Sequence, residues 1–230
     1  MITNYNSFVD ALLNAGFSMG GGNSDGIYAI INWGWNNVAP YNTPVTWHTG
    51  NKDTDPWEWR MRVLEDRDDI AYGKFFFKKS GFITRDWYPY FLAARRSNSF
   101  EDTYVSGTLS HDAKRVYDII AQNDATPSHI IKQAAGYSKE SKSAFERALV
   151  ELQMQMFITV CGQQAKLSKK GDEYSMPSAM FCTTEKFWGE DVFDQAAQIS
   201  TNEAIKIITA QVMELNPAAQ SKKILKFIRG

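Results

Sequence analysis

Between Ser110 and about Phe181, the spacing of the hydrophobic residues changes from that of helices to that of strands. Few folds have their elements in this order. Apolar residues first recur at three- and four-residue steps in three successive stretches, which is the spacing of amphipathic helices. Two β-prone stretches then follow around a turn that is rich in lysine. We predict three helices followed by a β-hairpin, packed together as one unit.

Capping residues and glycine set the predicted helix boundaries. Ser110 precedes the first helix, and Thr126 with Pro127 is expected to begin the second, because proline fits the first helical turn. Gly136 is expected to end the second helix in the left-handed conformation, and Ser138 to start the third. A short glycine-containing turn between two helices is typical of the helix-turn-helix motif. With the hairpin that follows, the segment is predicted to be a winged helix.

The third helix is predicted to bury one side and to expose the other. Its apolar stripe consists of Phe145, Ala148, Leu149, Leu152 and Met156. In helix-turn-helix proteins the first turns of this helix enter the major groove, where side chains meet phosphates and base edges. The predicted DNA-binding residues are Lys139, Ser141, Lys142, Ser143 and Arg147 on the helix, with Lys166, Lys169 and Lys170 on the hairpin.

The local excess of positive charge is modest. Between Ser128 and Lys170 there are seven lysine or arginine residues against three glutamates. Solvated surface helices often carry such charge, and winged-helix modules also serve as protein-docking or purely structural units. A DNA-binding surface and a docking module are therefore both open interpretations.

Length and charge limit the class of protein. The chain has 230 residues, enough for two domains, and a formal net charge of −1, so nucleic-acid contact requires a local patch. No apolar run approaches the roughly 20 residues that span a bilayer, and no secretory signal opens the chain. We expect a cytoplasmic protein without a membrane partner, and we predict no oligomeric state.

The sequence predicts neither a metal site nor a cofactor. The three histidines are not spaced as metal ligands. Cys161 and Cys182 fall in predicted strands of the hairpin and are expected to be free thiols that could be neighbours. The glycine run at 20–22 lacks the Lys-Ser/Thr of a phosphate loop, so a flexible turn or linker is the interpretation.

The first half of the chain also contains a helix followed by a lysine-bearing hairpin. Asp55 is expected to cap a helix that starts at Pro56, and strands are expected at 70–77 and 82–84. This echo suggests a second, degenerate winged-helix unit. The predicted fold is α+β and mostly helical, with tandem winged-helix units and additional C-terminal helices. The predicted boundaries are 1–97 for the N-terminal α+β unit, 98–109 for a linker, 110–188 for the winged helix and 189–230 for the C-terminal helices.

Long stretches of the chain resemble a known family. They are GFSMGGGNSDGIYAIINWGWNN, TWHTGNKDTDPWEWRMRVLEDRDDIAYGKFFFKKSGFITRDWYPYFLAARR and the winged-helix segment that follows. Together they are similar, over nearly the whole chain, to a bacterial family described as AlkZ-related. The resemblance implies tandem winged-helix units, because the AlkZ-type DNA glycosylases are built in that way and excise alkylated or crosslinked bases. Some members of the family carry a transcription-regulator label.

The resemblance does not supply an active site. The glycosylases place the attacking water with a Gln-x-Gln or Gln-x-Asp motif near the start of their first winged-helix unit, and the first hundred residues here contain none. Gln153-Met154-Gln155 has this spelling, but it lies at the end of the predicted third helix. We interpret these glutamines as exposed polar residues at a helix end.

Two groups of residues in the first half are candidates for an enzyme site. Asp55 and Glu65 are the catalytic candidates, because carboxyl groups can act as general acids or bases. Accessible aromatic rings beside arginine can stack an unpaired base. The candidate pocket consists of Trp57, Trp59, Arg60, Tyr88 and Tyr90. Packing between two small domains is the alternative role for these rings.

Three functions follow from the sequence. The leading hypothesis is a winged-helix protein that binds double-stranded DNA, either as a transcription regulator or in DNA repair. The first alternative is a DNA glycosylase-like enzyme that acts on alkylated bases. The second alternative is a protein- or ligand-binding module without a nucleic-acid role.

Overall fold

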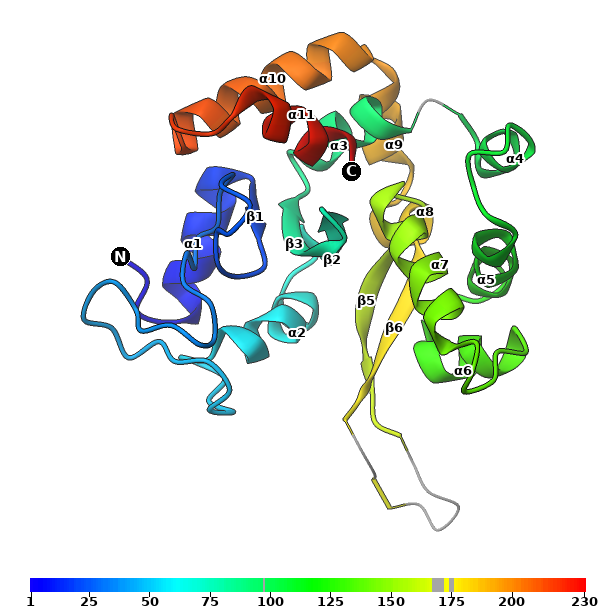
Figure 1. Cartoon of the computed structure of the whole chain (residues 1–230), viewed down its shortest axis with the longest axis horizontal. Coiled ribbons are helices and arrows are strands. Elements are labelled where there is room, and N and C mark those ends of the chain that lie inside the picture. The colour runs from blue at the N-terminus through cyan, green and yellow to red at the C-terminus, as the bar shows by residue number, and fades with distance from the viewer. Residues whose placement is uncertain (97, 167–171, 174–175) are drawn as a thin grey trace. The chain divides into compact units, whose positions relative to one another are not determined.

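A computed structural model describes residues 1–96, 98–166, 172–173 and 176–230. The fold is α+β, and the chain divides into two compact units. Unit 1 joins Met1–Ser97 to Glu190–Gly230, and unit 2 spans Asn98–Gly189. Figure 1 labels most of the elements of both units.

Unit 1 opens with a helix, three antiparallel strands and a second helix. These elements are α1 (Tyr5–Ala15), β1 (Phe17–Met19), α2 (Pro56–Asp66), β2 (Ile70–Phe76) and β3 (Lys79–Thr84). Strands β1 and β2 both pair with β3, so their spatial order is β1-β3-β2. Phe77 and Lys78 take positive φ angles of 52° and 63° in the tight turn between β2 and β3. The hairpin predicted around Lys78 is confirmed.

The C-terminal helices return to unit 1 and complete its core. Helix α3 (Tyr88–Arg95) is joined there by α9 (Glu190–Ala197), α10 (Thr201–Leu215) and α11 (Ser221–Arg229). Helices α9, α10 and α11 all contact α3. The ring of Phe227 stacks on Phe76 with 4.1 Å between centroids, and Phe17 and Phe91 surround the pair. Residues 190–230 are therefore an integral part of unit 1.

Unit 2 contains the predicted run of three helices and a hairpin. Its elements are α4 (Phe100–Val105), α5 (His111–Ala121), β4 (Thr126–Pro127), α6 (Ser128–Ala134), α7 (Lys142–Met154), β5 (Ile158–Gln164), β6 (Ser178–Thr183) and α8 (Thr184–Trp188). Strands β4 and β5 both pair antiparallel with β6, which gives the order β4-β6-β5. The pairing pattern in unit 2 is thus the same as in unit 1.

Three local expectations in unit 2 differ from the structure. Part of the predicted linker 98–109 forms α4, which Ser99 caps and which stacks Phe100 on Tyr117 at 3.6 Å between ring centroids. Thr126 lies in β4 and does not cap α6, which starts at Ser128. The third helix begins at Lys142, because residues 138–141 form a turn.

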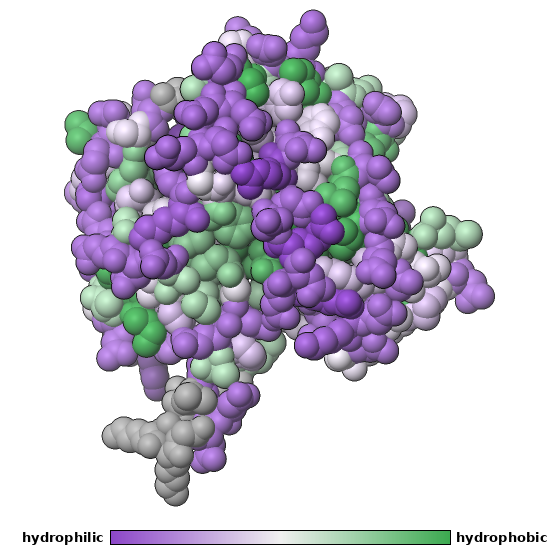
Figure 2. Space-filling model, turned by 180° about the vertical axis from the view of Figure 1, so that it is seen from behind, coloured by the Kyte–Doolittle hydropathy of each residue, from purple (hydrophilic) through white to green (hydrophobic). Residues whose placement is uncertain are grey.

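Burial follows the apolar stripes of the first and third predicted helices in unit 2. Ala113, Val116 and Ile120 of α5 are buried, and α5 packs against α7. The predicted stripe of α7, from Phe145 to Met156, is buried as well. The face shown in Figure 2 is mostly polar, with hydrophobic residues in separate patches. No helix in the described part of the chain is long and apolar enough to cross a membrane.

Candidate nucleic-acid interface and aromatic pocket

The side of α7 opposite its buried stripe carries the predicted DNA-binding residues. Lys142, Ser143 and Arg147 are exposed on the first turns of the helix. Lys139 is exposed and Ser141 half-buried in the turn that precedes it. The five residues therefore lie together at the N-terminal end of α7, although two of them stand just outside the helix.

The turn before α7 is held in place by short hydrogen bonds and by α5. The Ser138 amide donates to Ser141 Oγ at 2.9 Å. The Tyr137 hydroxyl donates to a carboxylate oxygen of Asp112 at 2.6 Å, and the Arg115 guanidinium lies 4.2 Å from the centre of the Tyr137 ring. This anchoring fixes the direction in which the N-terminal end of α7 projects, as a preorganised binding surface requires.

Three glutamates lie on or near this surface: Glu140 and Glu146 are exposed on it, and Glu151 is directed away from it. Glu151 accepts from the amide and the hydroxyl of Ser110 at 2.8 and 2.7 Å, which directs it to the start of α5. Glu146 forms an exposed ion pair with Lys142 at 3.4 Å, a contact that solvent weakens. Among the described residues, neither Lys139 nor Arg147 has an ion-pair partner. The surface thus presents cationic groups that are available to an anion.

The hairpin beside α7 is described at its base. Strand β5 contacts α7 and ends with the exposed side chains of Gln163 and Gln164, and the half-buried Lys166 follows. Lys169 and Lys170 lie outside the described residues. Pro177 stands directly before β6, which begins at Ser178.

The two cysteine thiols are free and lie close together in the hairpin. Thr159 on β5 pairs with Cys182 on β6. Cys161 follows Thr159 by two residues on β5, so it lies next to Cys182. A hydrogen bond from the Cys182 thiol lowers the pKa of Cys161, while the same bond and burial raise the pKa of Cys182. The expected proximity of the two cysteines is confirmed.

Two residues of the predicted pocket belong to the core of unit 1. Trp59 is fully buried and stacks on Phe8 with 5.0 Å between ring centroids. Tyr88 is fully buried against Phe75. Neither ring has exposed surface for a ligand, because Trp59 lies on the buried side of α2 with Met61 and Val63, and Tyr88 lies on the buried side of α3. Tyr90 is half-buried beside Trp87 on α3.

The remaining pair of the predicted pocket forms part of a row of rings. The Arg60 guanidinium lies 3.4 Å from the centre of the half-buried Trp57 ring, within cation–π distance. The His48 ring lies 4.9 Å from Trp57, and the Trp35 ring 6.0 Å from His48. We call Trp35, His48, Trp57 and Arg60 the aromatic row. Trp35 and His48 were not among the predicted pocket residues, because they come from the irregular loop before α2, where no periodic pattern indicates which side chains lie together.

The catalytic candidates are far apart and one of them is fully engaged. Asp55 is buried, and its carboxylate accepts four backbone N–H groups at 2.7 to 3.0 Å, those of His48, Thr49, Gly50 and Trp57. It therefore caps α2 and holds the preceding loop. Glu65 is exposed near the other end of α2, about 15 Å along the helix axis at 1.5 Å per residue. The two carboxyl groups cannot act as a pair.

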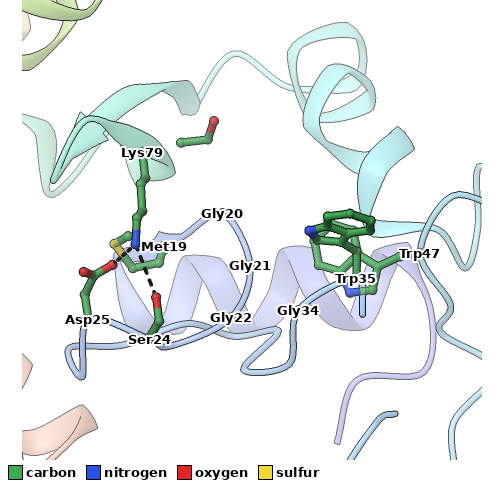
Figure 3. A pocket seen from close by; sticks show the side chains of 11 residues that line it. Met19, Gly20, Gly21, Gly22, Ser24, Asp25, Gly34, Trp35, Trp47 and Lys79 are labelled. Carbon is green, nitrogen blue, oxygen red and sulfur yellow. Dashed lines mark hydrogen bonds and ion pairs between the residues drawn. The ribbon is translucent and has the colours of Figure 1, made fainter. Parts of the chain in front are cut away.

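A pocket of about 160 Å³ lies in unit 1 at the end of the aromatic row. Figure 3 shows the glycine run 20–22 between two different walls. Trp35 and Trp47 form one wall, and an ion pair of 2.7 Å between Lys79 and Asp25 forms the other. The glycine run is a turn, as expected, but it is anchored by hydrogen bonds from Gly20 to Ser80 and from Gly22 to Ile31, both 2.8 Å.

No metal centre is evident in the described ranges. No group of three or more histidine, cysteine, aspartate or glutamate side chains there could hold a metal ion.

Comparison with known proteins gives one match. A family model described as AlkZ related matches residues 2–229 of the chain. No curated protein and no solved structure matches significantly.

Proposed function

The chain belongs to the AlkZ-related family, and from this membership we propose that it binds duplex DNA through unit 2, with α7 in the major groove. One observation carries the proposal, namely the cationic and hydroxyl side chains of Lys139, Lys142, Ser143 and Arg147, exposed together at the N-terminal end of α7. In helix-turn-helix proteins this end of the corresponding helix makes the base contacts.

The order of elements supports a tandem winged-helix interpretation. In unit 2 the order α5, β4, α6, α7 and the hairpin β5–β6 is that of a winged helix. Unit 1 repeats it with α1, β1, α2 and the hairpin β2–β3, and the loop 20–55 takes the place of the middle helix. The common strand pairing, in which the first strand joins the last, favours a degenerate first unit.

The exposed groups suit the two kinds of contact that DNA requires. Lysine and arginine neutralise phosphates, and serine hydroxyls reach phosphates or base edges. Because the net charge of the chain is −1, this local patch provides the attraction. An acidic or apolar face would have favoured the protein-docking alternative.

The biological context that fits best is DNA repair in the cytoplasm, since the AlkZ-type glycosylases that the chain resembles excise damaged bases. Transcription regulation is the second context. The glycosylase-like alternative has less support, because Asp55 is occupied by backbone amides. The interpretation of Gln153 as an exposed residue was wrong, since its side chain is buried and its Nε2 donates to the Leu149 carbonyl. Incubation with alkylated duplex DNA, followed by an assay for abasic sites, tests for this activity.

Equilibrium binding at several salt concentrations tests the DNA-binding proposal. We expect the affinity of the protein for a duplex to fall steeply with salt, because each neutralised phosphate releases counterions. Lys142→Glu/Arg147→Glu should weaken binding and reduce the slope of log K against log salt by about two. Lys52→Glu/Lys206→Glu, which changes the charge equally at exposed positions outside unit 2, is the matched control.

Three results contradict the proposal. The first is an absence of duplex binding by the wild-type chain. The second is binding that does not depend on salt. The third is an equal loss of affinity in the Lys142/Arg147 variant and in the Lys52/Lys206 control.

A further inference from the structure

The pocket in unit 1 has an aromatic wall that remains largely in water. The Trp35 side chain is 68% exposed, although tryptophan is ordinarily well buried. It lines the pocket next to Trp47 and makes a T-shaped contact with His48. An exposed indole at the mouth of a pocket is a stacking surface for another flat ring.

The backbone beneath this wall is held in an uncommon conformation. His48 has a φ of 61°, which non-glycine residues rarely adopt. Hydrogen bonds from the amides of His48, Thr49 and Gly50 to the buried Asp55 maintain it. The hydrogen bonds to Asp55, which caps α2, thus offset the cost of this conformation. Backbone strain of this kind clusters at functional sites.

The floor of the pocket is glycine backbone that packs closely against its neighbours. A Cβ atom on Gly21 would lie 2.5 Å from the Trp47 ring, and one on Gly20 would lie 2.9 Å from the Ser80 carbonyl oxygen. The missing side chains let Trp47 lie against the turn and leave backbone alone beneath the cavity (Figure 3).

The opposite wall offers both donors and acceptors without net charge. Lys79 Nζ donates to Asp25 at 2.7 Å and to Ser24 Oγ at 3.2 Å. The Asp25 carboxylate neutralises the ammonium and disfavours a phosphate at this position. A neutral ring that carries both acceptors and donors suits this wall better than an anion.

We propose that this pocket holds one unpaired nucleobase, stacked on Trp35 and hydrogen-bonded at its edge by the Lys79–Asp25 pair. The base is neutral, flat and bordered by donors and acceptors, as the walls of the pocket require. That the base belongs to a DNA strand rests on the proposed function, whereas a free nucleoside offers the same ring chemistry.

Binding to two DNA duplexes tests the proposal and shows whether the base can belong to a DNA strand. One duplex has a thymine opposite an abasic site, and the other is fully paired. Trp35→Ala should bind the first duplex about tenfold more weakly, since stacking of a base contributes about 1–3 kcal/mol, and should bind the second as the wild type does. Trp35→Phe should restore most of the affinity, and Val38→Ala, at a 92% exposed position in the same loop, should change neither. Equal affinities of wild type and Trp35→Ala for the first duplex overturn the proposal for a base in DNA.

A second measurement separates failure of the pocket from failure of the proposed function. Thymidine and adenosine are added to the protein while the indole N–H signals are followed by NMR, with Trp35→Phe and Trp47→Phe variants identifying the two signals. A shift of the Trp47 signal that Trp35→Ala abolishes supports the pocket even when no duplex binds. If neither nucleoside shifts that signal and Trp35→Ala binds both duplexes normally, the pocket does not bind a base, whatever α7 does.

Discussion

The guanidinium of Arg95 donates hydrogen bonds to the carbonyl oxygens of Ile228 and Phe227 at 2.6 and 2.8 Å, which ties α3 to the last turn of α11. A third bond of 2.8 Å reaches the Phe75 carbonyl in β2. The carbonyls at the end of a helix have no partners within it, and the negative end of its dipole favours a cation. Removal from water lowers the pKa of Arg95 to about 9, so the side chain remains charged at neutral pH.

Arg95→Met should destabilise unit 1 by about 3 kcal/mol, because it leaves three carbonyl groups without their donor. Urea unfolding followed by circular dichroism measures the change, and limited proteolysis shows whether residues 221–230 become accessible. Arg229→Met, at an exposed position on α11, is the control. An Arg95→Met protein with wild-type stability would show that the three bonds contribute nothing.

Asp55→Ala should lower the free energy of unfolding by about 2–4 kcal/mol, since four amide donors lose a charged acceptor. Asp55→Asn, which keeps one acceptor oxygen, should cost less. Hydrogen exchange of the amides at 48–50 should accelerate in both variants. Asp53→Asn, at a largely exposed side chain, should leave these amides protected. Unchanged exchange in Asp55→Ala would refute the structural role of this carboxylate.

The ion pair between Arg67 and Asp69 should give a pH-dependent contribution to stability. Hydrogen bonds from Arg67 lower the pKa of Asp69 in the folded state. The contribution is therefore complete above the ordinary pKa of an aspartate, about 3.9, and is lost as the pH falls through the lowered value. Both side chains are about one-third exposed, so we expect about 0.5–1 kcal/mol.

Urea unfolding of Asp69→Asn at neutral and at acidic pH measures this contribution. The variant should be less stable than the wild type at neutral pH, and the difference should shrink in acid. Asp68→Asn, at an exposed neighbouring carboxyl group, serves as the control. A difference that grows as the pH falls would have the wrong sign for this pair.

Cys161 should react with iodoacetamide faster than Cys182. Its thiol is half-buried and has a lowered pKa, whereas Cys182 is buried and has a raised pKa. The thiolate is the reactive form, so the rate follows the pKa and the exposure. Cys182→Ala removes the hydrogen bond and should slow alkylation of Cys161 at neutral pH. Mass spectrometry of the labelled peptides gives both rates, and faster labelling of Cys182 would contradict the arrangement.

Local signals in the sequence were sufficient for most of the secondary structure. Ser110, Asp55 and Gly16 each mark a helix end as capping chemistry requires. The start of α7 was placed too early, because Ser138 forms a turn with Ser141 that resembles a cap in sequence. Helix α4 was missed because it is short and buries Phe100 alone.

The candidate pocket was harder to predict because exposure depends on tertiary packing. Trp57, Trp59 and Trp35 have the same side chain, yet Trp59 is fully buried and Trp35 is largely exposed. The α2 sequence places apolar residues on more than one side of the helix, so its spacing does not identify the buried face. The pocket also joins residues from three distant segments, at 19–25, 34–47 and 79–80, which no local pattern links.

The contact between the Trp47 ring and Gly21 limits how the sequence of loop 20–55 can vary. Even an alanine at position 21 would push the indole of Trp47 away and disturb the pocket that this indole borders. A run of three glycines usually indicates a flexible backbone. Here glycine is required at position 21, because the Trp47 ring leaves no room for a side chain. Chains that keep this indole should therefore keep the glycine opposite it, and the two positions are expected to vary together or not at all.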